Sequence, residues 1–271
     1  MSGDPEPGSA AQRVVATQSV TQRVSVVTGA SSGIGRAMAL ALARRGDLVL
    51  GIGRNPDRLA DLAQALAAAG PAPHRVLALD VASPADMDQL RQQLADLGRV
   101  DLLIASAVLG RSGASALPLR TRDLPLADWQ AMIDVNLHGV FLANRAALGL
   151  MRAAGDGDIV NIASSTTPHG LRGTAMAPAY CAAKFAIAAL GREMATELGP
   201  EGIRVRTIFP GTVDTPLIAD TLLDGPFGGR MRVESFATAL IGLIELGRDM
   251  VLPDPHLLPV PKARTPRDVA R

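Results

Sequence analysis

The chain has 271 residues, of which 48% are hydrophobic and 20% charged, a composition that favours one large α/β domain over two small ones. Its formal net charge of +1 argues against a nucleic-acid-binding protein, because such proteins hold phosphates with an excess of positive charge. No apolar run approaches the roughly 18 residues of a membrane span, no signal peptide is recognisable, and the lone Cys181 excludes an internal disulfide, so we expect a cytoplasmic location.

Residues 1–22 are rich in Pro, Gly, Ser, Ala and Gln without a firm period, which predicts a flexible N-terminal arm. Residues 23–42 read RVSVVTGASSGIGRAMALAL and predict a buried strand, a glycine-rich turn and a helix. Glycines let a ligand approach the main chain, and a helix N-terminus presents free N–H groups and a positive dipole end to a phosphate. We therefore expect a nucleotide diphosphate at this turn; an ordinary tight turn is the alternative.

Strands and helices alternate through the rest of the chain. Asn55 and Ser83 are predicted N-caps, each followed by a proline at the first helical position. Long segments at 109–125, 164–179 and 215–232 follow predicted strands and are candidates for functional loops. Further strands are predicted at 48–52, 75–81, 101–107, 158–163 and 203–209, with a proline-restricted edge strand at 250–260, and helices at 56–69, 83–97, from 128 onward, 180–198 and 234–247.

This alternation predicts a three-layer, doubly wound parallel α/β sheet that occupies residues 23–262 as a single domain and leaves a polar tail at 263–271. In such sheets, ligands bind beyond the carboxyl ends of the strands. Because each long loop follows a strand, we expect the loops to gather on that rim.

Tyr180 and Lys184 are four residues apart in a predicted helix, so they lie on one face with roughly 5–6 Å between their Cβ atoms. A nearby ammonium group favours the phenolate and is expected to lower the pKa of the phenol from about 10. Tyr180 is therefore a candidate general acid or base. Because this spacing is common by chance, an exposed tyrosine beside a surface lysine is the alternative.

Five motifs occur in order along the chain: TGASSGIG at Thr28–Gly35, Asn136 in DVNLHG, Ser164 after IVNIA, the pair Tyr180 and Lys184, and Pro210-Gly211. Together they resemble the short-chain dehydrogenase/reductase family, over nearly the whole folded part of the chain. The resemblance implies a Rossmann fold and hydride transfer between a nicotinamide and a carbonyl or alcohol.

Carried over residue by residue, the resemblance implies four catalytic groups. Tyr180 would protonate the carbonyl oxygen during reduction, while Lys184 would hold the nicotinamide ribose and lower the pKa of the tyrosine. Ser164 would hydrogen-bond the substrate oxygen, and Asn136 would anchor a water that passes protons to solvent. Ser165 is adjacent to Ser164, but Ser164 follows the strand in register and is the preferred match.

The end of the second strand indicates the cofactor. It carries Gly53 and Arg54 without an acid, and a guanidinium suits the 2′-phosphate of NADP(H). Asp80 and Val81 resemble adenine contacts, although Asp80 could simply end a strand, and Val213 and Thr215 resemble carboxamide contacts. The expected cofactor-binding residues are Thr28, Gly29, Ser31, Ser32, Gly33, Ile34, Gly35, Arg54, Asp80, Val81, Ala107, Tyr180, Lys184, Pro210, Gly211, Val213 and Thr215.

One stretch departs from the family pattern. After the fourth strand the family usually has Asn-Asn-Ala-Gly, where this chain has Ala105-Ser106-Ala107-Val108. The loss of two amides and a glycine affects contacts to the cofactor ribose, but removes no proton-transfer group.

The candidate pocket walls are mostly aliphatic, which predicts an apolar ketone or alcohol as substrate and favours a ketoreductase of secondary metabolism. We expect no metal, because the histidines lack metal-ligand spacing, and a homodimer or homotetramer formed through alanine-rich helices. The alternative is a non-catalytic NADP-binding sensor of the same fold. The candidate lining residues are Leu109, His169, Leu171, Met176, Leu217, Leu222 and Phe227.

Overall fold

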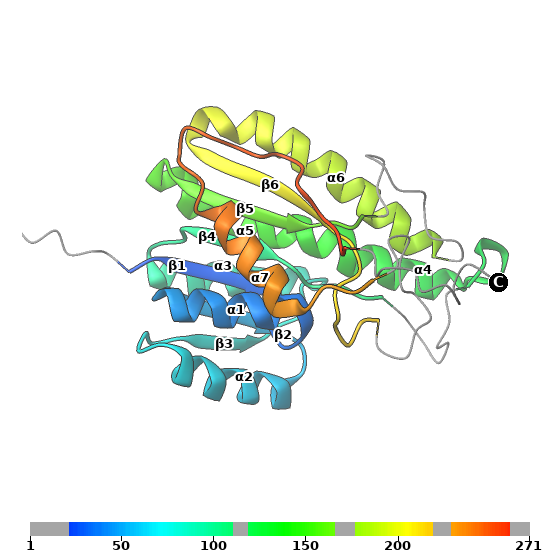
Figure 1. Ribbon diagram of the computed structural model, residues 1–271, viewed down its shortest axis with the longest axis horizontal. Helices are drawn as coiled ribbons and strands as arrows, with labels where there is room; N and C mark the ends of the chain where they lie inside the picture. The colour runs from blue at the N-terminus through cyan, green and yellow to red at the C-terminus, as the bar shows by residue number, and fades with distance from the viewer. Residues whose placement is uncertain (1–21, 111–118, 166–176, 219–228, 261–271) are drawn as a thin grey trace, which may run out of the picture.

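A computed structural model describes residues 22–110, 119–165, 177–218 and 229–260. Within them, seven parallel strands form one sheet in the order β3-β2-β1-β4-β5-β6-β7 (Figure 1). This confirms the predicted doubly wound sheet. The strands are β1 (Val24–Thr28), β2 (Leu48–Gly53), β3 (Arg75–Ala78), β4 (Leu102–Ala105), β5 (Gly157–Ile162), β6 (Ile203–Pro210) and β7 (His256–Leu257).

Helices cover both faces of the sheet and complete three layers (Figure 1). Apolar residues of α1, α2 and α7 pack on one face, and those of α3, α5 and α6 pack on the other. The helices are α1 (Gly33–Arg45), α2 (Pro56–Ala69), α3 (Pro84–Leu97), α4 (Leu126–Ile133), α5 (Gly139–Ala154), α6 (Pro178–Leu198) and α7 (Val233–Ile244), with a π-helical turn at Asp134–His138 and 3₁₀ turns at Thr121–Asp123 and Gly199–Glu201.

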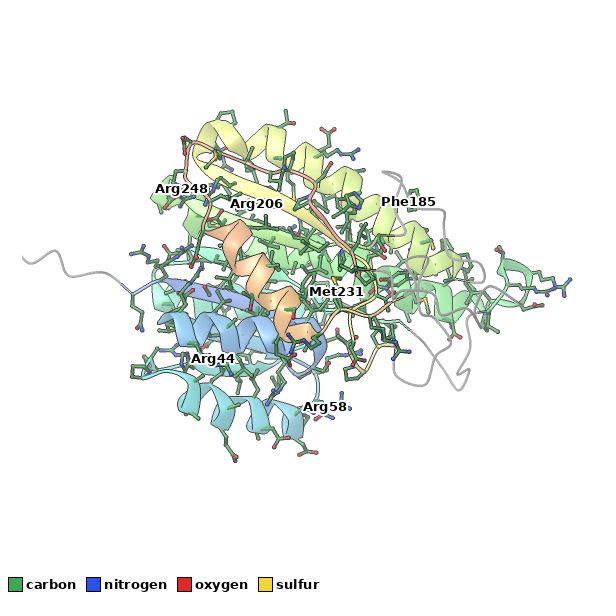
Figure 2. All side chains as sticks on the ribbon, in the orientation of Figure 1. Arg44, Arg58, Phe185, Arg206, Met231 and Arg248 are labelled. Carbon is green, nitrogen blue, oxygen red and sulfur yellow. The ribbon has the colours of Figure 1, made fainter. Side chains whose placement is uncertain are left out.

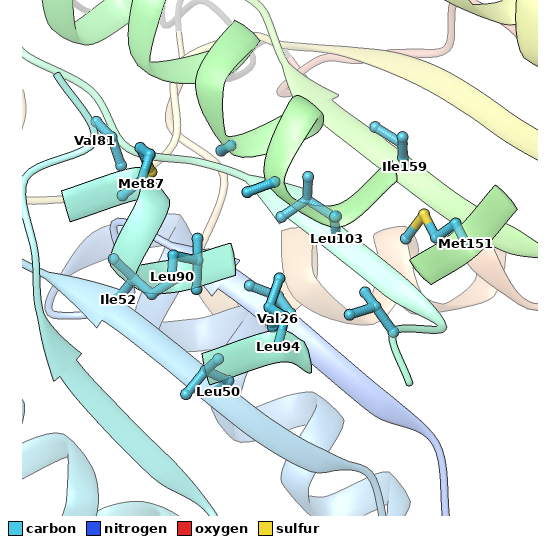
Figure 3. Packing of buried hydrophobic residues seen from close by; sticks show 14 of the residues in the cluster. Val26, Leu50, Ile52, Val81, Met87, Leu90, Leu94, Leu103, Met151 and Ile159 are labelled. Atoms are coloured by element: carbon cyan, nitrogen blue, oxygen red, sulfur yellow. The ribbon is translucent and has the colours of Figure 1, made fainter. Parts of the chain in front are cut away.

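One of the two main core clusters lies between the sheet and α3, α5 and α6 (Figure 3). Val26 and Leu103, from the neighbouring strands β1 and β4, meet Leu90 and Leu94 of α3 and Met151 of α5. All five side chains are fully buried. Each contributes about 1.5–3 kcal/mol through burial, so the centre of the sheet is a rigid support for the loops at its rim.

The predicted N-caps are confirmed. The Asn55 side chain accepts a hydrogen bond from the Arg58 N–H at 2.8 Å, and the Ser83 hydroxyl accepts one from the Asp86 N–H at 3.2 Å. Both caps are followed by a proline at the start of the helix, as expected. The short turns that carry β2 and β3 into their helices are thus fixed by local chemistry.

Three predicted elements need correction. The strand predicted at 75–81 ends at Ala78, because the Asp80 N–H bonds the Asp86 carboxylate instead of a neighbouring strand. The edge strand predicted at 250–260 is reduced to β7, since Pro253 and Pro255 offer β6 only carbonyl groups. The helix predicted from 128 onward is divided into α4 and α5 by the π-helical turn.

Candidate active site

The glycine-rich turn lies between the carboxyl ends of β1 and β4, where the strand order changes direction. Gly29 has a φ of +69°, and a Cβ atom there would lie 2.7 Å from the Cα of Ala107. The Thr28 hydroxyl accepts hydrogen bonds from the N–H groups of Ser106 and Ala107, at 3.1 and 3.2 Å. The turn therefore sits directly against the end of β4 and leaves a main-chain surface for a ligand.

The N-terminus of α1 is suited to an anion. Its N-cap residue Ser32 makes no capping hydrogen bond, and the first turn contains no acidic residue but does contain Arg36. A basic first turn opposes the helix dipole unless an anion compensates it. Thr215 borders this turn, since a Cβ on Gly33 would lie 3.4 Å from its side chain. The turn at Gly29, where no side chain fits, and the uncapped N-terminus of α1 together suit the diphosphate of a nicotinamide dinucleotide.

The predicted catalytic residues of β5 and α6 come together at the same rim. Pro178 begins α6 and places Tyr180 in its first turn, where it hydrogen-bonds with Ser164, the second residue after β5. Lys184 is 2% exposed and donates to the Ile162 carbonyl at 2.7 Å. Its Nζ lies 5.8 Å from the centre of the Tyr180 ring.

The direction predicted for the Tyr180 pKa is wrong in this structure. Burial raises the pKa of the phenol above its ordinary value, while the hydrogen bond from Ser164 acts in the opposite direction. The lysine does not reverse this, because burial lowers the pKa of Lys184 to about 8 and its Nζ is turned to the Ile162 carbonyl. The phenol is therefore protonated at neutral pH and able to donate a hydrogen bond.

Asn136 occupies the π-helical turn between α4 and α5 and is fully buried. Its amide oxygen accepts from the Leu109 N–H and its amide nitrogen donates to the Leu109 carbonyl, both at 2.8 Å. Asn136 thus fixes the backbone just after β4. The partners of Asn136 and Lys184 are backbone atoms of Leu109 and Ile162, and the sequence carries no signal for such contacts.

The ends of β2 and β3 carry the residues expected at the adenosine half of the cofactor: Arg54 at the 2′-phosphate, and Asp80 and Val81 at the adenine. Arg54 lies on the surface, 3.6 Å from the Asp80 carboxylate. A Cβ on Gly53 would lie 3.0 Å from the Ser31 hydroxyl oxygen and 3.1 Å from the Ser31 Cβ. Val81 is 5% exposed, and its side chain packs against Gly139 rather than lying on the surface. Because of the contact with Ser31, any side chain at Gly53 would be crowded.

The end of β6 supports both the serine and the segment that follows. The carbonyl of Pro210 accepts a hydrogen bond from the Ser165 N–H at 2.9 Å, which joins the ends of β5 and β6. Val213 forms a parallel bridge with Met231, and two hydrogen bonds of 2.8 and 2.9 Å flank that bridge. The segment after β6 therefore pairs with Met231 close to Gly211 and Thr215.

The departure after β4 is accommodated by packing. Ala105 is 1% exposed in a small apolar cluster with Val140, Ile187 and Phe209. Apolar contact therefore replaces the amide that the family usually has at this position. Ala107 and Val108 are half-buried, and Ala107 lies against Gly29 of the glycine-rich turn.

Two candidate lining residues lie at this rim: Leu109 follows β4, and Leu217 touches the neighbouring Gly110 closely enough to exclude a Cβ there. The loops after β4 and β6 thus meet. Other expectations fall outside the described residues, namely the arm before residue 22, the tail at 263–271, and the lining residues His169, Leu171, Met176, Leu222 and Phe227.

Among the described residues, no group of three or more His, Cys, Asp or Glu side chains is placed to bind a metal. None of the described helices has both the length and the apolar character needed to cross a bilayer.

Comparison with known proteins identifies relatives over most of the chain. The family model for short chain dehydrogenases matches residues 23–224. The cis-4-hydroxycyclohexanecarboxylate dehydrogenase of Sinomonas cyclohexanicum is 38% identical over 234 residues, which cover 82% of this chain and 89% of that protein.

Solved structures agree in fold. An alcohol dehydrogenase from the archaeon Thermococcus sibiricus, complexed with 5-hydroxy-NADP, has a TM-score of 0.75 and 29% identity, covering 87% of this chain and 96% of that one. A variant of the actinorhodin polyketide ketoreductase with NADPH has a TM-score of 0.76 and 26% identity, covering 88% and 96% of the two chains.

Proposed function

Because this chain belongs to the short-chain dehydrogenase family of oxidoreductases, we propose that it transfers a hydride between NADP(H) and a ketone or secondary alcohol. The observation that carries the proposal is the cluster of Ser164, Tyr180 and Lys184 at the same sheet rim as the glycine-rich turn. Neither a simple binding module nor a structural protein needs a buried lysine beside a serine-bonded tyrosine.

The residues perform distinct tasks in the reduction. A bound nicotinamide supplies the hydride. Tyr180, protonated because burial raises its pKa, donates its proton to the carbonyl oxygen, on which negative charge develops. Ser164 donates a hydrogen bond to the same oxygen. Lys184 binds the ribose hydroxyls. Asn136 bonds the backbone of Leu109 and anchors a water molecule that passes protons between Lys184 and the solvent.

Two features support NADP(H) over NAD(H). Arg54 presents a charged, planar donor set at the end of β2, which suits a 2′-phosphate. The acid that NAD enzymes often use in this region is absent, and a side chain at Gly53 would press on Ser31, whose hydroxyl oxygen lies 3.0 Å from the position of a Cβ. Two structural neighbours hold 5-hydroxy-NADP and NADPH, in agreement with this choice.

We further propose a neutral, largely apolar substrate, because Leu109 and Leu217 come from the two loops that meet at the rim. The likeness to a polyketide ketoreductase supports a ketone of secondary metabolism. A homodimer or homotetramer is proposed through α5 and α6, which expose Phe141 and Phe185 by 48% and 38%.

The test follows NADPH and NADH oxidation in the presence of a panel of apolar ketones. We expect turnover with NADPH preferred, and a loss of about 10²–10⁴-fold in Tyr180→Phe with NADPH binding retained. The adjacent serines form a matched pair: Ser164→Ala lowers kcat, whereas Ser165→Ala stays within a few-fold of the parent. Tight NADPH binding without turnover of any carbonyl would instead identify the sensor, and a preference for NADH would overturn the cofactor choice.

A further inference from the structure

A fully buried arginine lies far from the catalytic residues, on the face of β6 covered by α7. Arg206 is 0% exposed and lies two residues before Ile208 in β6, so both side chains are on one face of the sheet; Ile208 packs in the same cluster as Phe236 and Leu240 of α7. Figure 2 labels Arg206 on β6, with Arg248 toward the start of the strand. No step of the proposed reaction uses this side chain.

Only one nitrogen of the Arg206 guanidinium is paired. Its Nη1 donates to the Asp158 carboxylate at 2.7 Å. Its Nε and Nη2 are shielded from solvent, and neither has a hydrogen-bond partner in the described part of the chain. These two nitrogens form one edge of a planar group, and their N–H bonds point the same way, as a fork that binds an anion from two sides.

The surrounding charges do not balance. Asp158 is 1% exposed and also accepts two hydrogen bonds from Arg204, at 2.9 and 3.0 Å. Arg248 and Arg23 lie 3.5 and 3.8 Å from the same carboxylate. One buried carboxylate therefore faces four guanidinium groups.

The remaining neighbours offset little of this positive charge. Asp156 pairs with Arg248 but is half-exposed, and the other donors of Arg204 bond backbone carbonyls at the end of α7. Burial lowers the pKa of Arg206, the hydrogen bond to Asp158 raises it, and the charges of Arg204 and Arg248 lower it further. The two buried guanidinium groups, those of Arg204 and Arg206, therefore share the one buried carboxylate of Asp158, whereas Arg23, Arg248 and Asp156 are partly solvated.

We propose that the Nε and Nη2 edge of Arg206 binds one small monovalent anion, chloride in ordinary salt solutions, between β6 and α7. Buried charged donors are rarely left without an acceptor, and an unmade bond of this kind is costly. A water molecule can also accept these bonds, but only an anion reduces the positive excess as well. The site is independent of the proposed reaction and would stabilise the fold.

The first test is a crystal structure grown or soaked in sodium bromide, with anomalous data collected at the bromine edge. We expect an anomalous peak in contact with both Nε and Nη2 of Arg206. Ordered density at this position without an anomalous signal would identify a water and overturn the proposal, as would a direct bond of both nitrogens to another part of the chain.

The second test measures Tm in sodium chloride and in sodium gluconate at equal ionic strength, because gluconate is too large for a closed site. We expect the Tm of the parent chain to be about 2–4 °C higher in sodium chloride than in sodium gluconate, once the chloride concentration exceeds the dissociation constant of the site several-fold. Arg206→Met removes the fork, and Arg206→Lys keeps the charge without the fork; both lose the difference between the two salts.

Arg99→Met is the control, because Arg99 also pairs with a buried aspartate, but its partner is Asp101 and not Asp158. This variant loses stability but keeps the chloride effect. If both Arg206 variants respond to chloride as the parent does, or if the parent responds equally to both salts, the proposed site does not exist.

Discussion

Replacing Asp158 by asparagine tests the main ion cluster of the fold. The Asp158 carboxylate accepts three hydrogen bonds from Arg204 and Arg206, at 2.7–3.0 Å, and is almost completely buried. Asparagine keeps the shape but removes the charge, and its NH₂ group faces guanidinium donors. Loss of one partner of a buried ion pair costs about 3–5 kcal/mol. For a chain of this size, that predicts a fall in Tm of about 6–20 °C.

The assay is urea unfolding followed by circular dichroism, with thermal melts in the same buffer. Asp88→Asn is the control, because Asp88 and Arg91 form an exposed pair at 3.7 Å and its loss changes stability by about 0–1 kcal/mol. Adding Arg206→Met to Asp158→Asn removes one of the two stranded guanidinium charges, since Arg204 remains, and restores part of the stability. A loss below about 1 kcal/mol in Asp158→Asn would refute the view that this carboxylate holds the arginines in place.

Three further predictions concern titration and cofactor choice. Because burial lowers the pKa of Lys184 from 10.5 to about 8, Lys184→Met stabilises the fold by about 2 kcal/mol below pH 8, and unfolding curves lose this gain as the pH rises toward 10.5. Burial also lowers the pKa of His74, whose ring accepts from the Val49 N–H. Its contribution is present above about pH 6.5 and lost as the pH falls, so between pH 7 and 5 the parent loses more Tm than His74→Gln; equal losses would contradict this. Gly53→Asp weakens NADPH binding without improving NADH binding, whereas the added change Ser31→Gly makes room for the acid and increases NADH affinity at least about 10-fold in fluorescence titrations; an equal gain in the single variant would contradict the steric argument.

Local chemistry made much of the fold predictable from the sequence. Asn55 and Ser83 cap their helices using atoms within three residues of each cap, so their roles can be read from neighbouring letters. The glycine-rich turn is similar, since its strand, turn and helix are contiguous. The order of these units then left few arrangements other than a doubly wound sheet.

The parts that escaped prediction depend on contacts between distant segments. The interruption at Asn136 arises where its side chain bonds the backbone of Leu109, and no periodicity reports that partner. Asp158 and Arg206 meet only because β5 and β6 pair in one register. The raised pKa of Tyr180 likewise follows from its burial, whereas the sequence showed only the nearby lysine.

The bridge between Val213 and Met231 fixes the two ends of the segment that follows β6. Backbone hydrogen bonds hold both ends of the intervening segment, at Thr212–Asp214 and at Met231. A graft from another dehydrogenase that replaces residues 219–228 alone leaves Thr215 and Leu217 in place, and a changed substrate preference in that graft is the outcome expected from the proposed function.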